Sequence, residues 1–189
     1  AEAWSLIEAK KAEILNIVGE YCYGVDDDSL ASKLVEMLLD NSLTISAAES
    51  LTAGLFQSEL AEIPGVSGAL AGGVVTYSEQ AKIEQLGILP ELIAQHGVVS
   101  SECAASMAFN VREKFGTHIG VGLTGVAGPG PQDHEPAGTV WIGLSIGQEK
   151  PVTYRLQLSG SRNTNRLRAV KFTCSYLMRK LVEKGYKKK

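Results

Sequence analysis

Short apolar runs alternate with longer amphipathic segments from residue 43 onward, and this alternation constrains the fold of the 189-residue chain more than any other feature. Short apolar runs bounded by turn residues are typical of buried strands, and the segments between them repeat their apolar residues with the period of an α-helix. Strands that are separated by helical crossovers pair in parallel and carry helices on both faces of the sheet. The alternation therefore predicts a three-layer α/β/α domain.

The last two predicted strands are joined differently from the others. Only the residues GQEK separate them, and so short a link permits only an antiparallel hairpin. We therefore expect a mixed, mostly parallel sheet of about five strands. The predicted strands cover residues 43–47, 71–76, 119–123, 139–146 and 152–158, and the predicted helices cover residues 52–62, 79–86, 90–95, 100–115 and 163–183.

The residues that precede this domain have a different pattern. Apolar residues between Trp4 and Val18 recur at helical spacing among Glu and Lys, which predicts an amphipathic helix. The stretch YCYGVDDDSL then interrupts the pattern, and Ser29 is placed to cap a second helix that runs to about Asp40. We expect three parts: helical connector residues 1–40, an α/β domain at 41–185 and a basic tail at 186–189.

Charge and composition exclude several function classes. A formal charge of −3 argues against a general nucleic-acid binder, because phosphate neutralisation by basic residues supplies most of that affinity. Cys22, Cys103 and Cys174 are too widely separated to indicate a zinc site or a disulfide framework. The chain has neither an apolar run near the roughly 20 residues of a membrane span nor a signal peptide. We expect a cytoplasmic protein without metal or cofactor.

Candidate site residues follow the first predicted strand, in the stretch AESLTAG. Glu49, Ser50 and Thr52 lie where the strand ends and a helix begins, and free N–H groups at such a helix start favour an anion or a developing oxyanion. A simpler interpretation is that Ser50 or Thr52 caps the helix, as these residue types commonly do. This stretch alone favours the cap.

A second candidate pair follows the second predicted strand. Tyr77 ends that strand, and Lys82 comes five residues later in the next helix, so both side chains can project toward one pocket. A lysine base and a tyrosine proton shuttle suit activation of a serine without histidine. Alternatively, Tyr77 is a half-buried wall residue and Lys82 is solvated.

Two further stretches offer binding groups. The glycine- and proline-rich segment LTGVAGPGPQDHEPAGTV is a predicted loop in which Thr124 supplies a hydroxyl and Gly125 an open N–H, although it lacks the signature of a phosphate loop. The segment SGSRNTNRLRAV places Arg162, Arg166 and Arg168 at the start of a helix. Arginines there oppose the usual preference for acids, which favours an anionic partner over a merely solvated face.

Taken in order from about residue 43 to 182, these stretches resemble the C-terminal domain of the competence/damage-inducible protein CinA, a family that includes nicotinamide-nucleotide amidohydrolases. The residues that carry the resemblance also include HGVVSSECAASMA and PAGTVWIGL, and YGVDDDSLASKLVEMLL resembles the connector of long members. The resemblance implies a parent chain with an N-terminal molybdopterin-binding-like domain, of which this sequence is an excised part.

The activity that the resemblance implies is hydrolysis of the carboxamide of nicotinamide mononucleotide to nicotinic acid mononucleotide and ammonia, a metal-free salvage step. The family's serine, tyrosine and lysine correspond to Ser50, Tyr77 and Lys82. We assign substrate contacts to Glu49 and Thr52, and to the N–H groups from Leu51 to Ala53 as an oxyanion hole. The remaining substrate-binding assignments, to the 5′-phosphate, are Thr124, Gly125, Arg162 and Arg166.

Three departures from the family pattern leave other functions open. The family usually reads ESCTGG where this chain has ESLTAG, so Leu51 and Ala53 replace a cysteine and a glycine. Pro131 replaces a glycine in the loop, which removes an N–H and flexibility. An inactive nucleotide-binding or regulatory module, or an oligomerisation domain whose N-terminal helices form a dimer contact, are the alternatives to an enzyme. We expect a homo-oligomer, with a dimer favoured.

Overall fold

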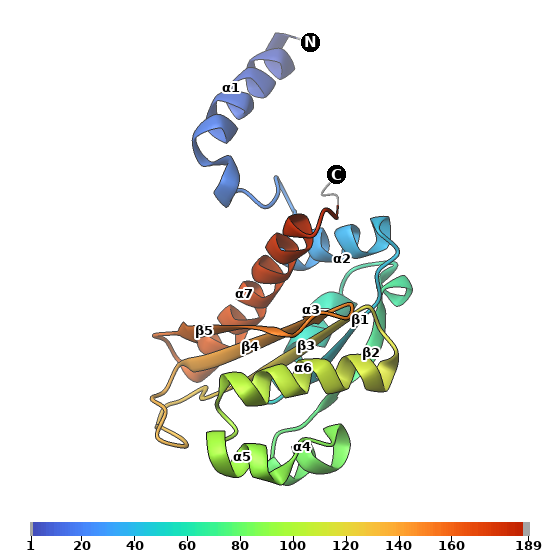
Figure 1. The fold of residues 1–189 in the computed structure, drawn as a ribbon. Helices are drawn as coiled ribbons and strands as arrows, with labels where there is room; N and C mark the ends of the chain where they lie inside the picture. Colours follow the sequence, from blue (N-terminus) through green and yellow to red (C-terminus); the bar gives the residue numbers. More distant parts are fainter. Residues whose placement is uncertain (1, 187–189) are drawn as a thin grey trace.

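The computed structural model describes residues 2–186, and its centre is a five-stranded sheet in the order β2-β1-β3-β4-β5 (Figure 1). The predicted mixed α/β sheet is confirmed. The tail residues 187–189 lie outside the described part of the chain. The strands are β1 (Ile45–Glu49), β2 (Leu70–Val75), β3 (Ile119–Gly125), β4 (Thr139–Ile146) and β5 (Val152–Gln157).

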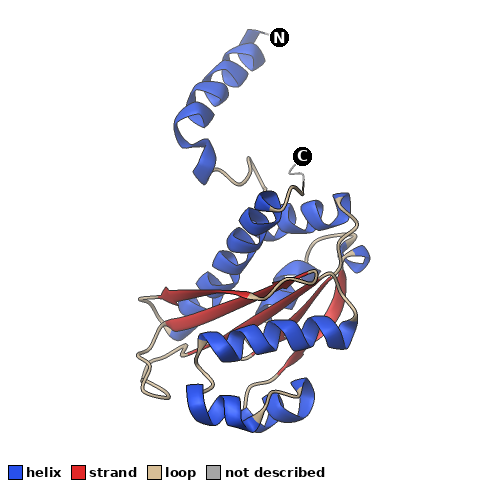
Figure 2. Ribbon diagram, viewed as in Figure 1, coloured by secondary structure: helices blue, strands red, loops and turns tan. Residues whose placement is uncertain are grey.

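Helices cover both faces of the sheet, so the domain has three layers (Figure 2). Helix α6 lies along one face with α4 and α5 beyond it, and α2, α3 and α7 cover the other face. The bounds are α1 (Glu2–Val18), η1 (Gly19–Tyr21), α2 (Leu30–Asp40), α3 (Leu55–Ala61), η2 (Val66–Gly68), α4 (Glu79–Leu86), α5 (Pro90–His96), α6 (Ser101–Phe115) and α7 (Arg162–Glu183).

The antiparallel part of the sheet is larger than the short link GQEK alone predicts. Strand β1 pairs in parallel with both β2 and β3, whereas β4 pairs antiparallel with β3 as well as with β5. The physical reason is that residues 126–138, which join β3 to β4, form a loop and contain no crossover helix. A loop without a helix returns the chain antiparallel to the strand it has just left.

The three parallel strands end at the same edge of the sheet. Glu49 is opposite Val75 on β2 and Leu123 on β3, so β1 and β2 end at the same level and β3 runs two residues further, to Gly125. The Ser50 N–H donates to the Leu123 carbonyl at 2.8 Å, which extends this pairing one residue past β1. Ligands of open α/β sheets bind at such carboxyl ends, so this edge is the place to look for a site.

Close packing of α6 on the sheet depends on glycines. Gly122 and Gly143 face each other on β3 and β4. A Cβ at Gly122 would lie 2.4 Å from the Ala104 carbonyl oxygen of α6, and one at Gly143 would lie 2.1 Å from the same oxygen. Because both distances are far below van der Waals contact, α6 can lie at its present depth only if these two positions carry no side chain.

The connector divides into a packed and a projecting part. Ser29 caps α2 as predicted, and α2 packs against α7 with Leu34 and Leu38 fully buried in the main core. Helix α1 extends away from the domain (Figure 1), and apolar side chains such as Trp4 and Ile17 remain 70% and 81% exposed. Within residues 2–186, no helix is long and apolar enough to span a membrane.

We predict that Gly143→Ala lowers the free energy of unfolding by about 1–3 kcal/mol, the usual cost of overpacking a core, because its methyl group collides with the α6 backbone. Urea denaturation measures the change. Gly19→Ala is the matched control, since its new Cβ would meet nothing closer than 4.0 Å. Equal midpoints for the two variants would contradict this account of helix packing.

Candidate active site

Ser50 and Lys82 are in direct contact at the carboxyl edge of the parallel strands. Ser50 directly follows β1, and Lys82 lies in α4, whose start is fixed by Ser78 as its N-cap. The Lys82 amino group donates to Ser50 Oγ at 3.1 Å and to the Thr76 carbonyl at 2.8 Å. It also lies 3.4 Å from the Tyr77 carbonyl. The structure thus brings together a hydroxyl and an amine that are 32 residues apart in sequence.

Lys82 is not the solvated helix residue that the alternative interpretation describes. Its side chain is 1% exposed. Burial lowers the pKa of Lys82, since removal from water disfavours the charged form, and the nearby Cys103, Asp133 and Glu79 oppose this by raising the pKa. Burial also raises the pKa of the Cys103 thiol to about 11, so that thiol stays protonated at neutral pH. A lysine with a lowered pKa is a suitable base.

Tyr77 contributes to the site through both its backbone and its ring. Its carbonyl faces Lys82 and lies 3.5 Å from Ser50 Oγ. Its hydroxyl accepts a hydrogen bond from Arg162, which also donates to the Gly128 carbonyl at 2.9 Å. Arg162 therefore links the segment after β2 to the loop after β3.

Neither Ser50 nor Thr52 caps the helix that follows, which begins at Leu55 and not at residue 52. Its N-cap is Gly54, which has no capping side chain. Glu49 instead accepts from the N–H groups of Gly54, Phe56 and Gln57 at 3.0–3.1 Å, and from the Gln57 side chain at 3.0 Å. The negative charge that the helix start favours is thus supplied by a fully buried residue of the chain itself.

A pocket of about 220 Å³ opens beside the Ser50–Lys82 pair. Ser50, Tyr77, Lys82, Thr124, Gly125 and Arg162 line this pocket, so six of the ten predicted site residues meet there. The Thr124 hydroxyl donates to the Val98 carbonyl at 2.6 Å, so it positions a wall of the pocket. Glu49, Thr52, Ala53 and Arg166 are absent from the lining.

Ala53 and Pro131, two of the departures from the family pattern, have different positions. Ala53 has a φ of 49° and is exposed, so its methyl group does not occupy the pocket. Pro131 lines the pocket, as does Leu51. Of the three substitutions, two therefore border the space available to a ligand.

Sequence reasoning missed part of the lining. Val98 and Val99, in the segment between α5 and α6, form apolar wall. The resemblance-carrying stretch HGVVSSECAASMA contains both, but nothing in their residue type indicates a site. The N–H groups of Ala127, Gly128 and Gly130 have no hydrogen-bond partner among residues 2–186. The glycines of this loop are the sequence feature that could have indicated these unpaired N–H groups.

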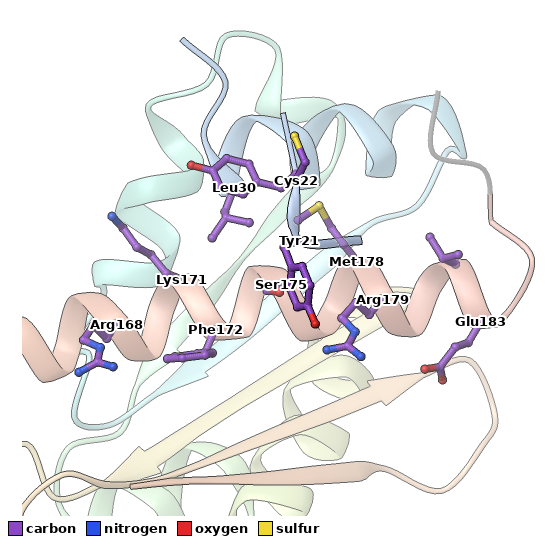
Figure 3. A pocket seen from close by; sticks show the side chains of 12 residues that line it. Tyr21, Cys22, Leu30, Arg168, Lys171, Phe172, Ser175, Met178, Arg179 and Glu183 are labelled. Atoms are coloured by element: carbon purple, nitrogen blue, oxygen red, sulfur yellow. The ribbon is translucent and has the colours of Figure 1, made fainter. Parts of the chain in front are cut away.

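A larger groove of about 650 Å³ lies elsewhere, between the connector and α7 (Figure 3). Basic side chains from α7, among them Arg168 and Lys171, line it together with Phe172 and Tyr21. The groove runs along the side of α7 and contains neither Ser50 nor Lys82. The smaller pocket is therefore the better candidate for chemistry, despite its size.

The protein is thus a three-layer α/β/α domain with a mixed sheet and a serine–lysine pair at the carboxyl edge of its parallel strands. Comparison with known proteins assigns the family: the CinA C-terminal domain matches residues 27–181, and the chain belongs to that family. The match includes α2, which agrees with the packing of that helix into the core. The family resemblance in the sequence is thereby confirmed.

Curated relatives carry the name competence-damage inducible protein. The protein of Lysinibacillus sphaericus is 70% identical over 188 residues, which cover 100% of this chain and 45% of that protein. The Geobacillus protein is 43% identical over 180 residues, covering 95% of this chain and 43% of its own length. The chain thus spans less than half the length of these relatives.

Solved structures share the fold. A CinA superfamily protein of Klebsiella pneumoniae superposes with a TM-score of 0.79 at 30% identity, covering 82% of this chain and 96% of that one. The Escherichia coli superfamily protein superposes with a TM-score of 0.76 at 28% identity, covering 85% and 96%. The fold described here is therefore that of CinA superfamily proteins.

We predict that Asp133→Asn lowers the pKa of Lys82 further, because it removes a carboxylate that stabilises the charged amine. NMR titration of isotope-labelled lysine side chains measures this pKa, with the Lys82 signal assigned by its loss in Lys82→Met. Asp27→Asn in the connector is the control. A rise in the Lys82 pKa, or an equal shift in the control, would contradict the placement of Asp133.

Proposed function

We propose that this domain hydrolyses the carboxamide of nicotinamide mononucleotide to nicotinic acid mononucleotide and ammonia, with Ser50 as nucleophile and Lys82 as base. The arrangement of acceptors around Lys82 Nζ is the observation that supports this most. Two of its three neighbours, the carbonyls of Thr76 and Tyr77, can only accept hydrogen bonds. The charged amine donates to Ser50 Oγ at 3.1 Å as well. In the neutral amine the two N–H groups satisfy the two carbonyls, and the lone pair is left to accept the proton of the Ser50 hydroxyl.

The reaction proceeds in two balanced steps. Ser50 Oγ attacks the carboxamide carbon while its proton passes to the lone pair of Lys82. The carbon–nitrogen bond then breaks as the Tyr77 hydroxyl gives its proton to the leaving nitrogen and takes the proton held by Lys82, and the nitrogen departs as ammonia. Water next attacks the acyl–Ser50 ester and gives its proton to Lys82, which returns it to Ser50 as the carboxylic acid leaves. One water is consumed and one ammonia released.

The N–H groups of Leu51 and Thr52 are our candidates for the oxyanion hole. Within the described residues neither has a hydrogen-bond partner, whereas the Ala53 N–H donates to the Ser50 carbonyl at 3.0 Å and is thereby excluded. N–H groups that are fixed before the reaction stabilise the developing negative charge without reorganisation.

The dimensions of the pocket fit part of a nucleotide. About 220 Å³ is below the range of roughly 300–1,000 Å³ that is usual for whole ligands, so the pocket suits a single ring with its carboxamide. Leu51, Val98 and Val99 supply apolar contacts for such a ring. Arg162, which is exposed at the lining, and the unpartnered N–H groups of the loop after β3 are our candidates for the 5′-phosphate.

The remaining assignments are proposals. Relatives of this domain are more than twice its length, which supports a two-domain parent, with an N-terminal molybdopterin-binding-like domain as the family resemblance implies. A cytoplasmic location and assembly as a dimer are further parts of the proposal. A domain that binds the nucleotide without turnover is the second candidate, and the positions of Leu51 and Pro131 at the pocket favour it. Calorimetric binding without ammonia release would distinguish it.

We predict that the purified chain releases ammonia from nicotinamide mononucleotide and that Ser50→Ala and Lys82→Met each reduce kcat at least about 100-fold, the lower end of a general base's contribution. A coupled ammonia assay measures the rates. Ser101→Ala, at a half-buried position, and Lys114→Met, at an exposed one, both lie outside the pocket and are the matched controls. Full activity in Ser50→Ala would refute the mechanism.

We predict for Tyr77→Phe a kcat about 100-fold lower with a smaller change in KM, if the tyrosine hydroxyl relays the proton to the leaving ammonia as the family resemblance implies. The hydroxyl must leave its partner Arg162 to do so. Steady-state kinetics separates the two constants. An unchanged kcat would show that Lys82 alone delivers the proton.

A further inference from the structure

The first turns of α7 hold the backbone of the loops that surround the pocket. Asn165 is buried and donates to the Ala127 carbonyl at 3.0 Å, in the loop after β3. Arg166, the next residue, donates from Nε to the Leu51 carbonyl at 3.0 Å and from Nη2 to the Thr52 carbonyl at 2.7 Å. One helix end therefore fixes loops that follow two different strands.

Arg166 binds the carbonyl of the Leu51–Thr52 peptide, the second peptide after the proposed nucleophile Ser50. In a planar trans peptide the C=O and the next N–H point in opposite directions. The guanidinium holds the Leu51 carbonyl, so the Thr52 N–H of that same peptide points away from α7. A charge-assisted hydrogen bond to the carbonyl also polarises the peptide, which makes its N–H a stronger donor.

Glu49 anchors the same turn from its other end. Its carboxylate binds the N–H groups of Gly54, Phe56 and Gln57, immediately after the turn formed by residues 50–53. Its backbone carbonyl accepts from the Thr76 N–H at 2.8 Å. Between the carboxylate and the guanidinium, the N–H groups of Leu51 and Thr52 are left without a partner in the described chain.

We propose that Arg166 is a positioning residue for the reactive serine: it orients the Leu51–Thr52 peptide so that the turn presents its N–H groups to the oxyanion. This inference rests on the proposed function of Ser50 as a nucleophile. It replaces the assignment of Arg166 to the 5′-phosphate. Nε and Nη2 of Arg166 already donate to backbone carbonyls, and Arg166 is absent from the pocket lining.

The two roles of Arg166 predict different kinetics. A positioning residue supports the transition state, so its loss lowers kcat for every substrate by the same factor. A phosphate-binding residue supports only phosphorylated substrates, so its loss changes the ratio between a nucleotide and its nucleoside. Arg162, which lines the pocket, is the reference for the second behaviour.

The experiment compares nicotinamide mononucleotide with nicotinamide riboside in the native chain, Arg166→Met, Arg166→Lys, Arg162→Met and Arg168→Met. We expect Arg166→Met to lower kcat about 10- to 100-fold on both substrates with little change in KM, as a displaced catalytic geometry does. Arg166→Lys recovers little of the lost kcat, since an ammonium group cannot span two carbonyls as the planar guanidinium group does. Arg168→Met, on the same helix, retains native rates.

A phosphonylation assay tests the inference without using the amide reaction. A fluorophosphonate reacts with an activated serine, and intact mass spectrometry gives the rate of modification at Ser50, with Ser50→Ala as the blank. We expect Arg166→Met to slow this modification by a factor similar to that for kcat, while its thermal unfolding midpoint stays near that of Arg166→Lys. Because the phosphonate carries no nicotinamide ring or ribose, the assay isolates the serine turn.

Each outcome bears on one proposal or on both. Equal modification rates and equal kcat in the native chain and Arg166→Met would overturn the positioning role, as would an effect confined to the phosphorylated substrate. Modification of Ser50 in a native chain that releases no ammonia would overturn the proposed function, and slower modification in Arg166→Met would still support positioning. A native chain with neither modification nor turnover would overturn both.

Discussion

The contact between the buried Lys82 amine and Ser50 Oγ is the interaction on which the rest of the site depends. Two backbone carbonyls at the end of β2 hold the amine, and they are where they are because β2 ends level with β1. A buried amine is costly when charged, so the same burial that places Lys82 beside the serine also moves its pKa toward the range of a useful base. The strand register therefore determines both where Lys82 is buried and how basic its amine is. The loops add the side chains that line the pocket and the N–H groups that can donate to a ligand.

The fold was largely predictable because its determinants are local. Strand and helix periods located the elements, and the shared carboxyl edge of parallel strands brought Ser50, Tyr77 and Lys82 to one place. The antiparallel pairing of β3 with β4 was harder to predict from the sequence, since it follows from the lack of a crossover helix in the loop at residues 126–138. Glycine at positions 122 and 143 is likewise uninformative in sequence, because its reason is a carbonyl on a helix far along the chain.

Within the site, residues whose role is fixed by long-range contacts were assigned less well than residues on strand ends. Glu49 precedes a serine at a strand end, and Arg166 lies among arginines at the start of a helix, and in sequence both patterns favour a ligand. In the structure the Glu49 carboxylate is saturated by backbone N–H groups and the Arg166 guanidinium is bound to backbone carbonyls. A charge that stabilises a turn and a charge that binds substrate have the same signature in one sequence, and only their hydrogen-bond partners distinguish them.

The two glycines beneath α6 also affect the pocket. Helix α6 follows directly after Val98 and Val99, and the Thr124 hydroxyl ties Val98 to the end of β3. The depth at which α6 lies on the sheet therefore sets how far this wall stands from Ser50. A side chain added at Gly122 or Gly143 would raise the helix and enlarge the space beside Ser50, so these two glycines help to set the size of ligand that the pocket can hold, although neither lines it.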